Sequence, residues 1–424
     1  MRILITGASG FIGSHIVQAL RSEHDIVACV RNPRALRARF PGIDVIACDF
    51  ATDLSATNWI PRLQSIDAVI NTVGIIRESK RQSFDRLHHQ VPCALFRACE
   101  QMDIKRVIQI SALGADETAI SHYHRSKKAA DDCLKQLDLN WIIIKPSLVY
   151  GPGGKSAAFF KALSALPAIP IVDNGEQLVQ PIHIDDLTAV ISAMLLPNAP
   201  ARVSADAVGP QPIRFKDMLL QYRHWLGKAR PFLVPIPYSV ALLTGKFAGF
   251  LGETPLTHEA VKMLRQGNTG DVSTLKAVTM PRSFESALRE QPAQQADRWH
   301  AGLFFLRPLL RITLGLLWLL TGILSLGIYP VDQSLALLAQ VGISGSLAPF
   351  VLYGAALLDI ALGLATLVRW QLHWVGLTQI TLMMGYSVLI TVGLPEYWLH
   401  PFGPITKNIP LIVATLIMLV LEER

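Results

Sequence analysis

Charged residues are spread so unevenly along this 424-residue chain that its two parts must fold under different rules. From Leu303 to Arg424 the sequence holds only five Lys or Arg and five Asp or Glu. The formal net charge of +7 therefore lies entirely within residues 1–302. A basic excess suits an anionic membrane surface or a phosphorylated cofactor. Basic residues are not interleaved with aromatic ones, so no nucleic-acid partner is expected.

Four apolar stretches fill the poorly charged part. They are Leu309–Ile328, Phe350–Val368, Trp374–Leu394 and Ile405–Leu421. The first three approach the ~20 residues that a helix needs to cross a bilayer. The fourth reaches that length only if the side chain of Lys407 extends to the interface. We therefore predict that residues 296–424 form an all-α domain of four transmembrane helices, with the lipid bilayer as its partner.

The basic residues between these stretches predict an orientation. Arg307 and Arg311 precede the first stretch, and Arg369 separates the second from the third. Residues 329–349 contain no Lys or Arg. Because cytoplasmic loops are enriched in Lys and Arg, both ends of the chain are expected on the inner side of the cytoplasmic membrane. The first predicted strand begins next to Met1, so no signal peptide is expected before it.

Two further features of the apolar part are unusual for membrane helices. Asp359 lies in the middle of the second stretch, where an ionisable side chain either packs against a neighbouring helix or serves a ligand or a proton. Residues 400–410 read HPFGPITKNIP, and three prolines interrupt any helix there. This segment, with LLDIALG around Asp359, resembles the DoxX-like membrane family. Some relatives in that family are associated with quinone-linked oxidation, which implies a lipophilic or quinone-like substrate.

The N-terminal part opens on a turn that predicts a nucleotide site. An apolar run from Ile3 to Ile5 meets glycines at positions 7, 10 and 13, and a helical pattern follows. Glycines let the backbone approach a pyrophosphate closely, and the free N–H groups at the start of a helix bind its charge. The spacing therefore predicts a dinucleotide cradle at Gly7, Gly10 and Gly13.

The alternation of strands and helices predicts an α/β fold with a doubly wound parallel sheet. Strands are expected at 2–6, 25–30, 43–47, 67–71, 106–111 and 141–145, and helices at 13–21, 33–39, 57–64, 83–101 and 120–137. Together they form a Rossmann domain over residues 1–295, with a small substrate lobe at about 151–290, where prolines are frequent. Within the lobe, the apolar stretch Leu233–Leu251 is expected to line an apolar cleft or to lean on the bilayer.

The end of the second strand bears on the choice of cofactor. An acidic residue there would bond the ribose 2′-hydroxyl of NAD, whereas this chain has Arg31, with Arg34 close by. Guanidinium groups bind a 2′-phosphate in a forked geometry, so NADP(H) is favoured over NAD(H). Residues after the third and fourth strands are also expected near the cofactor: Asp49, Phe50, Thr72, Val73 and Gly74.

Tyr123 and Lys127 lie four residues apart on a predicted helix, so their side chains share one face. A cation there lowers the pKa of the phenol and can bond the nicotinamide ribose. The tyrosine can then exchange a proton with a carbonyl or an alcohol while a hydride moves. Ser111, after an apolar strand, is expected to polarise the carbonyl. Binding of the cofactor alone stays open as the other role of Tyr123 and Lys127.

Together these residues resemble the extended or atypical branch of the short-chain dehydrogenase/reductase superfamily, which includes NAD(P)-dependent epimerases and dehydratases. The resemblance rests on the glycine turn, on Asp49, on Tyr123 and Lys127, and on KPSLVYGPG at 145–153. It implies that Pro146 begins the stretch that approaches the nicotinamide. Further motifs are similar to the branch that includes the nucleotide-binding accessory subunit of respiratory complex I: His88, SALG at 111–114, YHRSK at 123–127 and QPIHIDD at 180–186.

Two positions depart from the extended enzymes, and the departures keep several functions open. Those enzymes usually carry a second Ser or Thr just after the position of Ser111, where this chain has Ala112 and Leu113. Their asparagine on the fourth helix is replaced, and His88 stands near that place. The main hypothesis is a membrane-anchored oxidoreductase acting on a carbonyl or alcohol. The alternatives are a non-catalytic NADPH-binding subunit of a membrane complex and a nucleotide-sugar epimerase or dehydratase.

The expected site can be stated as residues. Catalysis is assigned to Tyr123, Lys127 and Ser111, and no metal site is expected. The cofactor-binding residues are Gly7, Ser9, Gly10, Phe11, Ile12, Gly13, Arg31, Asp49, Phe50, Thr72, Val73, Gly74, Lys127 and Pro146. His183 is expected to be structural. Because no C-x-x-C pair occurs and the count is odd, reduced and mostly buried thiols are expected at Cys29, Cys48, Cys93, Cys99 and Cys133.

Overall fold

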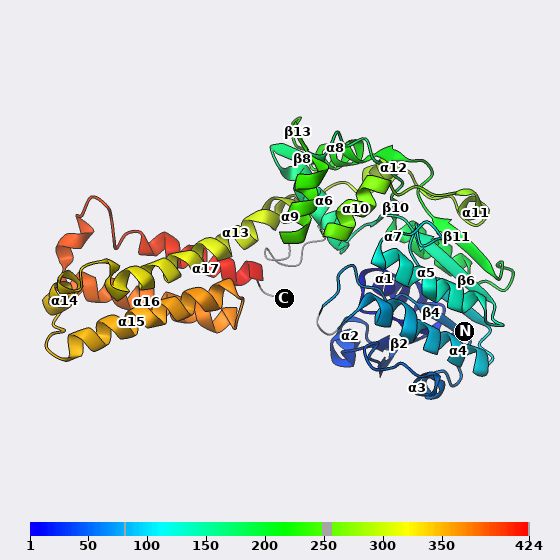
Figure 1. The fold of residues 1–424 in the computed structure, drawn as a ribbon, viewed down its shortest axis with the longest axis horizontal. Coiled ribbons are helices and arrows are strands. Elements are labelled where there is room, and N and C mark those ends of the chain that lie inside the picture. The colour runs from blue at the N-terminus through cyan, green and yellow to red at the C-terminus, as the bar shows by residue number, and fades with distance from the viewer. Residues whose placement is uncertain (80–81, 248–256, 423–424) are drawn as a thin grey trace. The chain divides into compact units, whose positions relative to one another are not determined.

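In a computed structural model, the chain forms two compact units, Met1–Ala301 and Gly302–Arg424 (Figure 1). The structure describes residues 1–79, 82–247 and 257–422, so the end of the predicted apolar stretch Leu233–Leu251 lies outside the described residues. The first unit contains a parallel sheet covered by helices, and the second contains helices. The predicted α/β fold followed by a helical domain is confirmed.

Seven strands build the main sheet of the first unit. They are β1 (Arg2–Thr6), β2 (Asp25–Val30), β3 (Asp44–Ala47), β4 (Ala68–Asn71), β5 (Arg106–Ile110), β6 (Trp141–Pro146) and β11 (Val203–Ala207). Their spatial order is β11-β6-β5-β4-β1-β2-β3, and every neighbouring pair is parallel. The direction of chain progression reverses between β1 and β4, and ligands of doubly wound sheets bind at such a switch point. β11 comes from within the predicted lobe and joins the sheet beside β6.

Alternate residues of β1 face two separate apolar cores, as a strand with a period of two requires. Ile3 and Ile5 pack with α1, α2 and α7, whereas Leu4 packs with α3, α4 and α5. These helices are α1 (Phe11–Leu20), α2 (Pro33–Arg39), α3 (Ala56–Trp59), α4 (Val91–Gln101), α5 (His122–Lys135) and α7 (Ile184–Ala193). A short helix η1 (Ile60–Arg62) continues α3, and a π-helical segment η2 (Asp85–Gln90) leads into α4.

Most of the remaining elements of the first unit form the lobe, whose core includes Tyr150, Phe215, Tyr222 and Phe284, whereas α11 packs through Leu275 with the core of the main sheet. Its strands pair two by two, β10 with β7, β12 with β9, and β13 with β8. The strands are β7 (Val149–Tyr150), β8 (Ala168–Val172), β9 (Leu178–Val179), β10 (Ile182–His183), β12 (Ile213–Arg214) and β13 (Phe232–Ile236). The helices are α6 (Lys155–Ala165), α8 (Phe215–Trp225), α9 (Tyr238–Phe247), α10 (His258–Gln266), α11 (Ser273–Lys276) and α12 (Phe284–Glu290).

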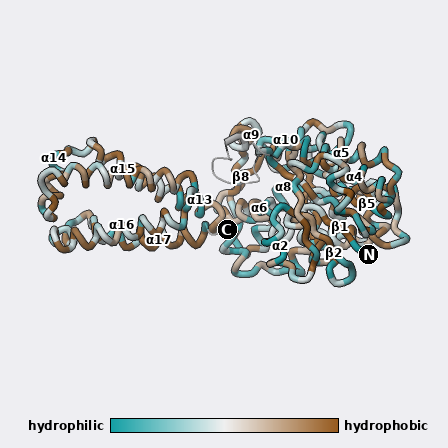
Figure 2. Tube along the Cα trace, turned by 90° about the horizontal axis from the view of Figure 1, so that it is seen from below, coloured by the Kyte–Doolittle hydropathy of each residue, from teal (hydrophilic) through white to brown (hydrophobic). Residues whose placement is uncertain are grey.

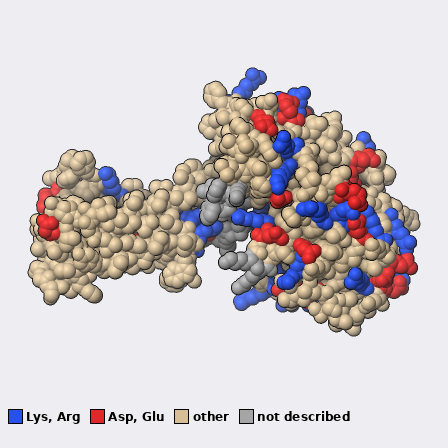
Figure 3. Space-filling model, viewed as in Figure 1, with Lys and Arg blue, Asp and Glu red and all other residues tan. Residues whose placement is uncertain are grey.

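The second unit is dominated by apolar helices, coloured brown in Figure 2. The helix α13 (Gln295–Ile323) begins in the first unit and continues into the second. The other elements of the second unit are η4 (Leu324–Ile328), α14 (Val331–Gln340), α15 (Leu347–Leu367), α16 (Leu372–Gly393), η5 (Pro395–Trp398) and α17 (Asn408–Glu422). Three segments are long and apolar enough to cross a membrane: Gln295–Ile328, Leu347–Leu367 and Leu372–Gly393. Figure 3 shows few charged side chains on the visible face of this unit.

The prediction of four membrane-spanning helices needs a correction at the fourth. Residues 400–407 form turns rather than helix, because the prolines of HPFGP interrupt it, and α17 begins only at Asn408. α17 has 15 residues. That length spans about 22 Å, which is short of the ~30 Å hydrocarbon core. The described part of the second unit therefore holds three helices of spanning length and one short apolar helix.

Buried charges join the helices of the second unit at one end. The carboxylate of Glu422 on α17 lies 2.6 Å from the guanidinium of Arg369, 3.5 Å from that of Arg307 and 3.6 Å from that of Arg311. Arg311 also donates to the carbonyl oxygen of Leu367, at 2.6 Å. The arginines on which the predicted orientation rests are therefore gathered into one cluster. Asp359 is buried within α15, and its Oδ1 has no hydrogen-bond partner among the described residues.

Candidate functional site

The glycine turn after β1 is packed so closely that two of its glycines have no room for a side chain. Gly7 has a φ of +70°, and a Cβ built on it would lie 2.8 Å from Oγ1 of Thr72. A Cβ on Gly13 would lie 2.3 Å from the carbonyl oxygen of Gly7. The Thr72 hydroxyl is fixed because it donates to the carbonyl oxygen of Thr6, at 2.7 Å. The turn, the start of α1 and the end of β4 thus meet in van der Waals contact at the switch point of the sheet.

The start of α1 presents backbone donors that no side chain occupies. Gly10 is its N-cap, without a side-chain hydrogen bond, and the first turn contains no acidic residue. The first N–H groups of a helix lack partners within it and, together with the helix dipole, attract an anion. Ser9 and Gly10 are exposed, and Phe11 and Ile12 are half-buried. This arrangement fits a pyrophosphate, as predicted from the glycine spacing.

The predicted cofactor-binding residues after β2 and β3 differ in how far their side chains are exposed. Arg31 and Arg34 are exposed at the end of β2 and the start of α2, and neither has a hydrogen-bond or ion-pair partner in the described part of the chain. Asp49 is exposed, and its Oδ1 accepts a hydrogen bond from the N–H of Ala51, at 2.9 Å. The side chain of Phe50 is buried against Trp59, with ring centroids 5.4 Å apart. Only the backbone of Phe50 is therefore available to a nucleotide.

A buried chain of polar side chains that the sequence did not single out fixes the carboxyl ends of β1, β4 and β5. The Thr6 hydroxyl donates to Oδ1 of Asn71 at 2.6 Å. Nδ2 of Asn71 in turn donates to Oε1 of Gln109 at 2.7 Å. All three side chains are buried. Because unmade hydrogen bonds are costly in the interior, this chain holds three strand ends in one geometry.

Lys127 brings a positive charge to the same edge of the sheet. Its side chain is 3% exposed. Its ammonium group donates to the carbonyl oxygens of Val73 at 3.1 Å and Ile110 at 2.9 Å. A Cβ on Gly74 would lie 3.3 Å from Nζ, so the predicted passage at Gly74 runs directly beside this charge. Burial lowers the pKa of Lys127 to about 8, and the carboxylate of Asp131 opposes that shift.

Tyr123 lies one helical turn before Lys127 on α5 and is half-buried. Its ring contacts His88 and Phe84 edge to face, with centroids 5.3 and 5.9 Å apart. The sequence predicts that Lys127 lowers the pKa of this phenol. In the structure burial dominates instead and raises the pKa of Tyr123 to about 12. The phenol therefore keeps its proton at neutral pH.

Ser111 has a partner that the sequence did not anticipate. Its hydroxyl donates to Oδ2 of Asp131 at 2.5 Å, and both side chains are buried. Burial raises the pKa of Asp131 to about 6, although the bond from Ser111 lowers it. Asp131 follows Lys127 by one helical turn, so Tyr123, Lys127 and Asp131 share one face of α5. That spacing was the available signal for Asp131.

A neutral histidine connects the Tyr123 segment to the loop after β4. Nε2 of His88 accepts a hydrogen bond from the N–H of Ile75 at 2.9 Å, so its Nδ1 carries the proton and donates to the Ser126 hydroxyl at 2.9 Å. Ser126 in turn donates to the carbonyl oxygen of Tyr123 at 2.8 Å. Burial, followed by the charge of Lys127, lowers the pKa of His88 to about 2.

Two other predicted positions have structural contacts. Pro146 ends β6, and its carbonyl oxygen accepts a hydrogen bond from the N–H of Leu113 at 3.0 Å. His183 caps α7, because its Nδ1 accepts from the N–H of Asp185 at 3.3 Å. These contacts fix how the chain leaves the sheet and enters the lobe.

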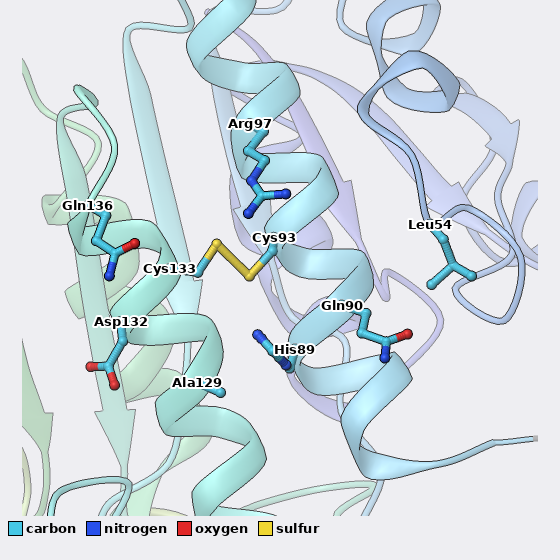
Figure 4. A pocket seen from close by; sticks show the side chains of 9 residues that line it. All are labelled: Leu54, His89, Gln90, Cys93, Arg97, Ala129, Asp132, Cys133 and Gln136. Carbon is cyan, nitrogen blue, oxygen red and sulfur yellow. A yellow bond between two sulfur atoms is a disulfide. The ribbon is translucent and has the colours of Figure 1, made fainter.

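The expectation of five reduced thiols is wrong for two cysteines. Cys93 of α4 and Cys133 of α5 form a disulfide, with Cα atoms 6.0 Å apart. The packing of α4 against α5 brings together two residues that are 40 positions apart. Figure 4 shows this disulfide at a cavity of about 510 Å³, with Arg97 and His89 beside it. Cys29, Cys48 and Cys99 are free and buried.

Comparisons with known proteins agree with both resemblances. Residues 7–160 match the family model described as NAD(P)H-binding, and residues 315–416 match that of the DoxX-like family. The solved structure of the enzyme WbmG of Bordetella bronchiseptica in complex with NAD covers 72% of this chain and 95% of its own, with a TM-score of 0.54. Its sequence is 17% identical, so it shows the fold alone.

Two curated relatives are more similar in sequence. The ceramide reductase of Caulobacter vibrioides is 26% identical over 253 residues, which cover 57% of this chain and 76% of that protein. The mitochondrial NADH dehydrogenase (ubiquinone) 1 alpha subcomplex subunit 9 of Arabidopsis thaliana is 24% identical over 248 residues, which cover 56% of this chain and 60% of that protein.

Replacing Gly13 by Ala is expected to weaken nucleotide binding strongly. The new Cβ would meet the carbonyl oxygen of Gly7 at 2.3 Å, so the turn must open and the cradle is lost. Titration of the purified chain with NADPH, followed by nicotinamide fluorescence, should show at least a ~30-fold weaker Kd, a loss of about 2 kcal/mol. Gly302→Ala is the matched control, because a Cβ there has nothing within 4 Å. Equal affinities of the two variants would contradict the assignment of the cradle.

Proposed function

We propose that this chain, in which an NAD(P)-binding Rossmann domain precedes a DoxX-like membrane domain, is a membrane-anchored reductase that uses NADP(H) to reduce a carbonyl of a lipophilic substrate. One observation carries the proposal. The Lys127 ammonium is fixed beside Gly74 at the carboxyl edge of the sheet, and the protonated phenol of Tyr123 lies one turn away on the same helix face.

The residues at the edge of the sheet fit the cofactor. Gly7 and Gly13 leave room for the pyrophosphate beside the free N–H groups of α1, and Arg31 and Arg34 offer unpaired guanidinium groups to a 2′-phosphate. Lys127 uses two of its three donors on backbone carbonyls, which leaves one for a ribose hydroxyl. When bound, the nicotinamide supplies the hydride.

The chain's own residues handle the proton. Tyr123 keeps its proton at neutral pH, so it can donate from its phenol oxygen to the oxygen of the carbonyl as that oxygen gains negative charge. The O–H bond of Tyr123 breaks, an O–H bond to the product alcohol forms, and solvent returns a proton to the phenolate. Lys127 is charged below about pH 8 and stabilises that phenolate. His88 and Ser126 are positioning residues, because they fix the backbone of Tyr123.

The membrane domain and one relative support a lipophilic substrate. The relative is called ceramide reductase, so we take a long-chain lipid carbonyl of the ceramide type as the first substrate class. A quinone-like acceptor is the second class, as the resemblance to the DoxX-like family suggests. The arginine cluster around Glu422 supports placing that end of the membrane domain at the inner face of the cytoplasmic membrane.

Tyr123→Phe is expected to remove turnover while leaving the cofactor bound. Losing a general acid lowers kcat by about 10²–10⁴-fold. The full chain in lipid nanodiscs would be given NADPH together with a ceramide-type ketone, a short-chain quinone or a soluble aldehyde. The oxidation of NADPH would be measured by the loss of its absorbance. Tyr397→Phe, in a turn of the second unit, is the control. Turnover with the soluble aldehyde only, or full activity of Tyr123→Phe, would contradict the proposal.

A second candidate function is a non-catalytic NADPH-binding subunit of a membrane complex. The favouring observation is that the hydroxyl of Ser111 is directed at Asp131, and that Ala112 and Leu113 supply no replacement hydroxyl. The similarity to a subunit of NADH dehydrogenase supports it further. The same nanodisc experiment separates the two functions, because this candidate requires NADPH binding without turnover in the unmodified chain.

The double variant Arg31→Ala with Arg34→Ala is expected to weaken NADPH binding and leave NADH binding unchanged. Each charge-assisted hydrogen bond to a phosphate contributes about 1.5–3 kcal/mol, so the Kd for NADPH should rise at least ~10-fold. Both nucleotides would be titrated against the same preparation. Arg289→Ala is the control, because this exposed arginine pairs only locally, with Glu285. A parallel loss of affinity for NADH would overturn the preference for NADP(H).

The rate of carbonyl reduction is expected to fall as the pH rises through about 8, where Lys127 loses its charge. Asp131 raises the pKa of Lys127, so Asp131→Asn should move this alkaline limb to lower pH. The neighbouring Asp132→Asn is the control, since Asp132 is paired with Lys128 at the surface. Profiles of kcat against pH for the three proteins test this prediction. An alkaline limb that stays in place in Asp131→Asn would contradict it.

A further inference from the structure

One apolar surface of the lobe takes no part in the proposed chemistry. On β13, Phe232 is 80% exposed, Leu233 37% and Val234 41%. On α9, which follows β13 directly, Val240 is 45% exposed and Leu243 57%. We call these five residues the docking face. Large apolar side chains gathered in one segment of a surface mark an interaction site.

The exposure of β13 is a property of its place in the fold. It pairs on one side with β8, whose Ile169 and Ile171 supply the core of the lobe. A strand with one buried face would alternate between buried and exposed residues, yet the first four residues of β13 are all exposed. Among the described residues, neither face of the strand is therefore fully covered.

Two prolines exclude a partner chain that would bind to β13 by adding another strand. Pro235 lies within β13 and Pro237 follows it, and neither offers an N–H group. A partner chain that added itself as a strand would need those donors. An occupant that makes no backbone hydrogen bonds, such as the hydrocarbon of a bilayer, meets no such obstacle.

Positive charges flank the docking face. Lys228 and Arg230 precede β13, are exposed and have no ion-pair partner in the described ranges. The guanidinium of Arg265 lies over the ring of Tyr238, 4.3 Å from its centroid. Asp173, in the turn after β8, brings a carboxylate to the same region, and its Oδ1 accepts a hydrogen bond from the N–H of Tyr238 at 3.0 Å. Cations beside exposed apolar side chains match the anionic headgroups and acyl chains of a membrane surface.

Two contacts within the first unit hold helices of the lobe to the start of α13 and to the segment between α12 and α13. The helix α13 continues into the first candidate span. Lys161 of α6 pairs with Asp297 at 2.9 Å. Nε1 of Trp225 on α8 donates to the carbonyl oxygen of Gln291 at 2.7 Å. Trp299 on α13 is 62% exposed, as is typical of a residue at headgroup depth. The lobe is therefore joined, within the first unit, to the beginning of the helix that continues into the first candidate span.

We propose that the docking face inserts shallowly into the bilayer, with Lys228 and Arg230 at the phosphate level. This insertion would bring the lobe to the membrane surface, where a lipophilic substrate must leave the bilayer to react. Only this statement about the substrate rests on the proposed function. The docking itself is tested without turnover.

The test uses a fluorophore at Phe232→Cys in the full chain, reconstituted in nanodiscs with nitroxide-labelled lipid. Selective labelling is feasible, because the three free cysteines are buried and the other two form a disulfide. Leu196→Cys is the matched control, because Leu196 is 60% exposed and lies in the turn after α7. We expect several-fold stronger quenching at 232 than at 196. Equal quenching at the two sites would overturn the proposal.

A second variant distinguishes insertion from other occupants. With the label at Leu243→Cys, an added Phe232→Asp should reduce quenching, while unchanged NADPH affinity shows that the chain is folded. Cross-linking of two copies through Phe232→Cys without quenching by labelled lipid would assign the face to a second copy and overturn the proposal. Strong quenching in a chain without turnover would support docking and refute only the proposed reductase function.

Discussion

The ammonium group of Lys127 is the constraint on which the rest of the site depends. A buried charge persists only if it is hydrogen-bonded, and the carbonyl oxygens of Val73 and Ile110 meet that need. Val73 lies in the loop just after β4 and Ile110 is the last residue of β5, so the charge can lie there only while the two strands keep their register. The hydrogen-bonded chain through Thr6, Asn71 and Gln109 fixes that register from within the sheet.

This buried charge also determines the ionisation of its neighbours. Burial and the charge of Lys127 keep His88 neutral, and the neutral ring can accept from Ile75 while donating to Ser126. The carboxylate of Asp131, on the next turn of α5, partly neutralises the charge of Lys127. Lys127 thereby holds the loop after β4 and the end of β5 directly, whereas Asp131 holds the hydroxyl of Ser111 and Ser126 holds the backbone of Tyr123.

Patterns among residues close together in the sequence predicted the fold well. The features that they did not predict depend on contacts between residues far apart in the sequence. The spacing of Gly7, Gly10 and Gly13 and the alternating directions of the side chains on β1 depend only on residues close together in the sequence. The sequence therefore predicts the first strand, turn and helix correctly. Asp131 and Ser126 acquire partners only when α5 meets β5 and η2. The bond between Cys93 and Cys133 likewise requires α4 to pack on α5. The fourth apolar stretch forms a shorter helix than its hydrophobic composition alone suggests, because the prolines before Asn408 decide where α17 begins.

The cost of burying this charge bears on the choice between a reductase and a structural subunit. The glycines, the uncapped start of α1 and Arg31 are the residues proposed to hold the nucleotide, and none of them requires a charge inside the domain. A buried ammonium beside a buried carboxylate stabilises a fold only if the two groups are well aligned and fully hydrogen-bonded. Replacing such a pair by hydrophobic residues of similar size often leaves the stability of the fold unchanged or higher. Stabilisation of the fold therefore gives little reason to bury Lys127 one helical turn from the half-buried Tyr123. A charge at this place would serve a ribose hydroxyl in either function, and it would serve proton transfer in the reductase alone.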